Sequence, residues 1–83
     1  METIIVEICI GANGEIADFI LPAHVKVSSL VGELVRLVEQ AYQEITFGEE
    51  PPVLYCLTSG TEISASTTLA SAGVRDGYRL LLV

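Results

Sequence analysis

The chain has 83 residues, 51% hydrophobic and 18% charged, which suits one folded domain, residues 1–83, with a modest core. Eleven acidic residues against four basic ones give a net charge of −7, which disfavours nucleic acid and anionic membrane surfaces as partners. The one apolar run near the start, residues 4–10, is interrupted by Glu7 and is too short to span a bilayer. These features indicate a cytoplasmic protein or domain.

The first part of the sequence predicts a β-hairpin. Residues 3–10 are rich in β-branched side chains, and their alternation favours a strand with one core-facing side: Ile4, Val6, Ile8 and Ile10. The sequence GANG at residues 11–14 is typical of a hairpin turn, because Asn and Gly tolerate positive φ. A second strand is predicted over about residues 15–21, with Asp18 facing water and Pro22 ending the strand because proline has no N–H to donate.

From Val27 the hydrophobic period changes from two to about 3.6, which predicts an amphipathic helix from about Ser28 to Ile45. Ser28 or Ser29 is placed to cap its free amides. The apolar stripe is wider than one sheet contact requires, which leaves two interpretations open. The helix is sunk deep against the sheet, or one edge of the stripe contacts a partner through Val31, Val35 and Tyr42.

The rest of the chain predicts three further strands. Gly48 and the pair Pro51-Pro52 end the helix. Strands are predicted over residues 53–58, around Ile63 and over residues 78–83, with a tight turn at residues 69–72 capped by Thr68. The order ββαβ(β)β is an α+β arrangement in which one long helix covers one face of a single sheet.

This order resembles the ubiquitin-like β-grasp fold. The hairpin, the helix, the Pro-Pro pair and the ending T-L-x-x-x-G-V-x-x-G-x-x-L, which begins at Thr68 and ends at Leu80, together carry the resemblance. The resemblance implies a mixed sheet of strand order 2-1-5-3-4. The first and last strands then lie parallel at its centre, so that Leu82 is a core residue.

The end of the sequence bears on the class of ubiquitin-like protein. Ubiquitin and the small sulfur carriers continue past the last strand into a Gly-Gly tail, whereas this sequence ends Leu81-Leu82-Val83. The stretch GVRDGYRLLLV is similar to the ending of the YukD/EsaB family, small bacterial ubiquitin-like proteins associated with type VII (ESX/WXG100) secretion. Tyr78 departs from that pattern, because an acidic residue is common there.

The resemblance implies a non-conjugated protein-interaction component of type VII secretion. Two alternatives remain open. One is a modifier or sulfur carrier truncated before its Gly-Gly tail, and the other is the cytosolic N-terminal domain of a larger secretion membrane subunit. The implied partners are proteins, among them secretion-machinery components, with a homodimer as a further alternative; neither nucleic acid nor direct membrane binding is expected.

No motif in the sequence indicates catalysis, a cofactor or a metal. His24 is the only histidine, and Cys9 and Cys56 lack metal-binding spacing. An enzyme is therefore not expected.

The resemblance implies that the interface is the sheet face opposite the helix, because ubiquitin-like domains commonly present that face to partners. Because Leu80 and Leu82 point inward, Leu81 points outward, where a lone monomer has no need of leucine. The expected interface residues are Leu54, Cys56, Arg79, Leu81 and Val83, with Thr3, Ile5 and Glu7 beside them. Sliding the third strand by one residue would exchange Leu54 and Cys56 for Tyr55 and Leu57. The helix edge at Val31, Val35 and Tyr42 is the second candidate surface.

Overall fold

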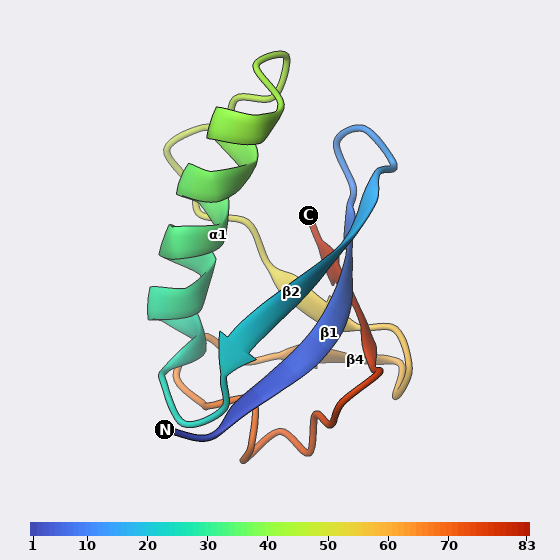
Figure 1. The fold of residues 1–83 in the computed structure, drawn as a ribbon. Helices are drawn as coiled ribbons and strands as arrows, with labels where there is room; N and C mark the ends of the chain where they lie inside the picture. Colours follow the sequence, from blue (N-terminus) through green and yellow to red (C-terminus); the bar gives the residue numbers. More distant parts are fainter.

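The computed structural model describes all 83 residues as one five-stranded sheet with a helix across one face (Figure 1). The strand order is β2-β1-β5-β3-β4, with β1 and β5 parallel and the other neighbours antiparallel. The elements in chain order are β1 Thr3–Ile10, β2 Ile16–Pro22, α1 Val27–Ala41, β3 Leu54–Cys56, β4 Thr61–Ile63 and β5 Arg79–Leu82. The predicted α+β class, strand order and central parallel pair are confirmed.

The core lies between α1 and the sheet. It is one cluster of 19 buried residues, none of them polar or charged. Alternate residues of the two central strands supply its fully buried floor: Val6, Ile8, Ile10, Leu80 and Leu82. Leu82 is thus a core residue, as predicted, and β5 must be in place for the two halves of the sheet to join.

The β1–β2 hairpin forms where predicted, with a different turn. Within this turn only Gly14 has positive φ, at 75°, and the Asn13 side-chain oxygen accepts a hydrogen bond from the Glu15 N–H at 3.0 Å. Pro22 is the last residue of β2 rather than the residue after it. Its partner Thr3 belongs to a non-hydrogen-bonded pair, because the adjacent Ala23 N–H bonds to the Glu2 carbonyl, so the missing proline N–H removes no ladder bond.

Helix α1 ends at Ala41, earlier than the predicted Ile45. Tyr42 has an extended backbone, with φ −127° and ψ 92°, which ends the helix. Ile45 nevertheless reaches the core from the following loop and is 6% exposed. The Glu39 carboxylate steadies that loop by accepting the Phe47 N–H at 2.9 Å. The apolar period therefore continued past the helix because the loop also packs inward.

The start of α1 is capped by tertiary contacts rather than by serine. Lys26 is the N-cap residue and makes no side-chain cap. The Val27 N–H bonds to the Thr67 carbonyl at 2.8 Å, and the Ser28 N–H bonds to the Ala65 carbonyl at 3.0 Å. A distant loop thus satisfies the free amides that a local side chain usually satisfies, so the expectation that Ser28 or Ser29 caps the helix is wrong.

The predicted register of the third strand is wrong by one residue. Leu54 pairs with Leu82 and Cys56 pairs with Leu80, and directly paired residues point to the same face of a sheet. Leu54 and Cys56 are accordingly core residues, 1% and 2% exposed. A slip of one residue moves every side chain of a strand to the opposite face, so Tyr55 takes the outward position.

The helix edge is also not the exposed surface that one interpretation required. Val31 is 5% exposed and belongs to the core, while Val35 and Tyr42 are half-buried and pack against it. The wide apolar stripe thus reflects deep packing against the sheet, at least for Val31.

Candidate interaction surface

Outward-facing side chains of four strands form an apolar row across the helix-free face of the sheet, which we call the open face. Cys9 lies beside Ile16 on one side and Leu81 on the other, and Leu81 lies beside Tyr55. Glu62 of β4 is the cross-strand partner of Tyr55 and ends the row. The row Ile16–Cys9–Leu81–Tyr55 crosses β2, β1, β5 and β3 in that order.

A second, charged row lies two residues further along the strands. Asp18, Glu7 and Arg79 are successive cross-strand neighbours on β2, β1 and β5. The Arg79 guanidinium lies 3.3 Å from the Glu7 carboxylate, and the Leu57 N–H donates to the Arg79 carbonyl at 2.8 Å. Arg79 is therefore held between Glu7 and the end of β3.

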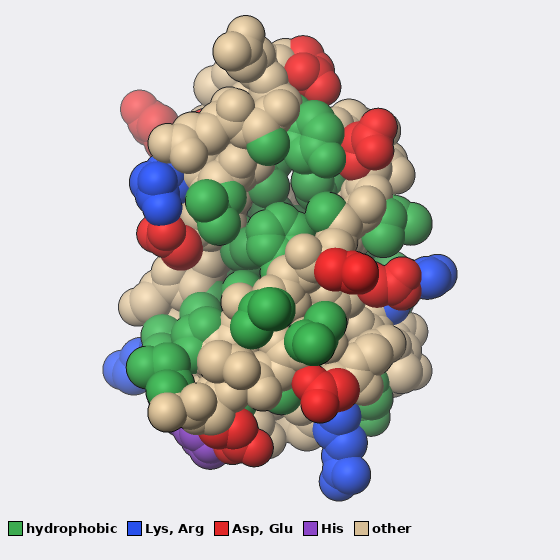
Figure 2. Space-filling model, viewed as in Figure 1, with side chains coloured by type: hydrophobic (Ala, Val, Ile, Leu, Met, Phe, Trp, Pro, Cys, Tyr) green, Lys and Arg blue, Asp and Glu red, His purple; other side chains and the backbone are tan.

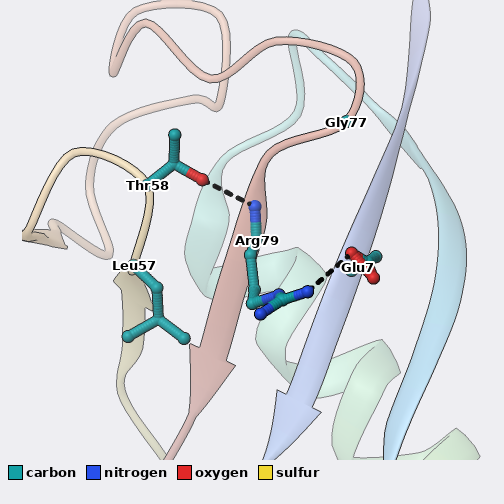
Figure 3. A pocket seen from close by; sticks show the side chains of 5 residues that line it. All are labelled: Glu7, Leu57, Thr58, Gly77 and Arg79. Carbon is teal, nitrogen blue, oxygen red and sulfur yellow. Dashed lines mark hydrogen bonds and ion pairs between the residues drawn. The ribbon is translucent and has the colours of Figure 1, made fainter.

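A shallow hollow of about 380 Å³ lies along the charged row, lined by Glu7, Leu57, Thr58, Gly77 and Arg79. Figure 3 shows the Arg79 side chain reaching toward Glu7, while the Thr58 hydroxyl accepts the Arg79 backbone N–H at 2.9 Å. Gly77, with φ of 85°, permits the turn that leads into β5. The hollow holds no histidine or cysteine, and its only ionisable groups are the paired Glu7 and Arg79.

Exposed apolar side chains concentrate on the open face. Nine large hydrophobic residues are substantially exposed, and seven of them occupy outward positions on it: Ile5, Ile16, Ile20, Val53, Tyr55, Leu57 and Val83. Cys9 and Leu81 fill the middle of the apolar row and are half-buried by these neighbours. Contiguous exposed apolar side chains of this kind usually mark a binding surface.

The residues predicted for the interface fall into two groups, one on the open face and one in the core. Arg79, Leu81 and Val83 lie on the open face as expected, whereas Leu54 and Cys56 lie in the core. The prediction named Tyr55 and Leu57 only as the consequence of a register slip, and it missed Ile16 and Ile20. Both isoleucines lie on the same face of β2 as Asp18, and the sequence predicted that Asp18 faces water.

Charges elsewhere lie apart from this surface. Arg36 on the outer side of α1 hydrogen-bonds Glu33, which lowers the pKa of Glu33 and raises the pKa of Arg36. His24 pairs with Glu2 in an exposed position. In the view of Figure 2 acidic side chains outnumber basic ones. No group of three His, Cys, Asp or Glu residues is placed to hold a metal ion, and α1 is neither long nor apolar enough to cross a membrane.

The comparisons with known proteins agree with the fold. A family model described as the WXG100 protein secretion system (Wss) protein YukD matches residues 3–82. The ubiquitin-like domain of the Mycobacterium tuberculosis type VII secretion system protein EccD1 is 23% identical, with a TM-score of 0.78 over 100% of this chain and 99% of that chain. The EccD5 ubiquitin-like domain from Mycobacterium xenopi is 23% identical, with a TM-score of 0.79 over 100% of this chain and 94% of that chain.

A chain of the MycP5-free ESX-5 inner membrane complex is 24% identical and gives a TM-score of 0.79, over 100% of this chain and 21% of that larger one. At these identities the structural likenesses establish the ubiquitin-like β-grasp fold. Comparison with curated protein sequences finds no match. Because the family model covers nearly the whole chain, this protein belongs to the YukD family of the WXG100 secretion system.

Proposed function

We propose that this protein is a ubiquitin-like component of a type VII (WXG100) secretion system that binds another protein through its open face. The observation that carries the proposal is the concentration of seven of the nine exposed large apolar side chains on that face. Family membership supports the secretion system as the setting. The interface that we propose comprises Ile16, Cys9, Leu81, Tyr55 and Leu57, with Arg79 and Val83 at its border.

We propose that the protein works in the cytoplasm and without catalysis. The likeness to a domain within an inner membrane complex supports a place beside the secretion machinery. A net charge of −7 favours protein partners over nucleic acid or anionic lipid. His24 lies in an exposed pair with Glu2, away from the hollow, which supports a binding role rather than acid–base chemistry.

A matched pair of leucines tests the interface. Leu57, on the open face, is 46% exposed, and Leu37, on α1 at the covered side of the sheet, is 38% exposed. We expect Leu57→Asp to abolish export of WXG100 substrates into the medium when it replaces the chromosomal gene, because a carboxylate prevents apolar contact with the partner. Leu37→Asp should leave export unchanged.

Both variants should give the wild-type circular dichroism spectrum and nearly the wild-type urea midpoint, since both side chains are exposed. Normal export with folded Leu57→Asp would overturn the proposal. Equal loss of export in both variants would show that the effect is not specific to the open face and would overturn it as well.

A further inference from the structure

Two like charges occupy directly opposite positions on neighbouring strands of the open face. Glu7 and Asp18 are cross-strand partners in the β1–β2 ladder. The Ile10 N–H bonds to the Glu15 carbonyl, and alternation from that pair makes Glu7–Asp18 a non-hydrogen-bonded pair. Side chains are closer in such pairs, and like charges directly opposite destabilise a ladder. The register therefore places two like charges opposite each other, where a neutral residue would be better for stability.

The cation available on this face does not neutralise both carboxylates. Arg79 lies on the far side of Glu7, with its guanidinium 3.3 Å from that carboxylate, and Asp18 takes part in none of the protein's ion pairs. Glu62, at the β4 end of the apolar row, is likewise unpaired. Outward strand residues thus present three carboxylates against one guanidinium, on a chain of net charge −7.

We propose that the open face docks a protein segment with an apolar stripe flanked by lysine or arginine. The stripe lies on the row Ile16–Cys9–Leu81–Tyr55, and the flanking cations lie beside Asp18 and Glu62. The two rows of the face are separated by two residues along the strands, roughly 7 Å, which the side chains of Lys and Arg span. This inference rests on the proposed function and specifies the chemistry of its partner.

A second copy of this chain fits the same surface poorly. Each copy would bring its own three carboxylates and a net charge of −7 to the contact, and its one guanidinium on this face is already paired with Glu7. We therefore expect sedimentation to show a monomer at all concentrations tested. A dimer that dissociates on Leu57→Asp would show that the occupant is a second copy and would overturn the proposal.

The test uses two synthetic helical peptides of equal length with the same leucine stripe. In one peptide the positions flanking the stripe are lysine, and in the other they are glutamate. Titrated into the ¹⁵N-labelled protein, the lysine peptide should shift the amide signals of the apolar row and bind more weakly as NaCl is raised. The glutamate peptide should not bind. Equal binding of both peptides, or binding of neither, would overturn the proposal.

Asp18→Asn distinguishes an effect on binding from an effect on folding, because it should stabilise the fold and weaken binding of the lysine peptide. Loss of the repulsion with Glu7 should raise the urea midpoint. Binding of the lysine peptide should become about fivefold weaker, the upper range for one exposed ion pair. Glu44→Gln removes the same charge from the exposed loop after α1 and should change neither measurement. A lower midpoint, or unchanged peptide binding, for Asp18→Asn would contradict the proposal.

The peptide titration and the Leu57→Asp export measurement test two different statements, and either statement can be wrong without the other. If Leu57→Asp blocks export while the two peptides bind alike, the open face is the interface and only the charge inference is wrong. If the lysine peptide binds selectively while Leu57→Asp exports normally, the partner chemistry is right and the proposed role in secretion is wrong.

Discussion

The two faces of the sheet are built from the same strands and both carry large apolar side chains, yet only one of the two faces is covered. On β5, Leu80 and Leu82 are fully buried under α1, while Leu81 between them is half-buried on the open face. On β1, Ile8 is fully buried, while Ile5 on the opposite face is 52% exposed. An apolar side chain on a strand therefore does not by itself mark the core here. What distinguishes the two faces is the helix, which covers one face only (Figure 1).

The distribution of charged side chains also distinguishes the two faces of the sheet. The core cluster contains no polar or charged residue, whereas the open face has a charged row beside its apolar one. A core must exclude unpaired charge because burial removes its hydration. A solvent-exposed surface has no such requirement, and in the interaction that we propose its charges select the partner.

The largest expected difference between the faces is in stability. Leu82→Ala should lower the free energy of unfolding by about 2–5 kcal/mol, because it leaves a cavity among fully buried neighbours. Leu81 is adjacent to Leu82 but lies on the open face. Leu81→Ala should lower the free energy of unfolding by about 1 kcal/mol, the loss expected when a partly buried apolar side chain is removed. Urea denaturation of both variants measures the comparison. Equal losses would mean that the open face is packed as a core.

A second difference should appear in thiol reactivity. Cys9 is half-buried in the apolar row of the open face, and Cys56 is 2% exposed on the opposite face. We expect a thiol reagent such as DTNB to modify Cys9 in the native protein, and Cys56 only when the fold opens. Cys9→Ser should then remove the native reaction, and Cys56→Ser should preserve it. The reverse result would restore the register that places Cys56 outward.

The smallest effect is expected at Ile20, which is 69% exposed on the edge strand β2. Ile20→Thr keeps the β-branched shape and should change the free energy of unfolding by less than about 0.5 kcal/mol. Ile8→Thr provides the matched substitution on the covered face, where a hydroxyl would be buried without a partner, and should be far more destabilising. Thermal melts of the two variants check this. A large loss for Ile20→Thr would indicate packing that the exposed fraction does not show.

The sequence was sufficient for the architecture because the strongest patterns are local and regular. Alternation over residues 3–10 and the 3.6-residue period after Val27 predict the hairpin and the helix, and the resemblance to the ubiquitin-like fold implied the central last strand. The structure contains all three. The open face as a surface was also predictable, since Arg79 and Leu81 follow from the inward positions of their neighbours in a strand of period two.

Other features depend on contacts between distant segments. The register of β3 is set by pairing with β5, and a three-residue strand with apolar residues at every position holds no periodicity from which to read its face. The helix start is satisfied by carbonyl groups of Thr67 and Ala65, some forty residues away in the chain, so no local cap signal was needed. The Glu7–Asp18 contact likewise exists only once β1 and β2 have their register. The sequence by itself thus determined which segments are strand or helix and which alternate positions can be buried, because those depend on neighbours in the chain. Only the tertiary structure decided which apolar residues remain uncovered and which charges meet, because those depend on pairing across the sheet.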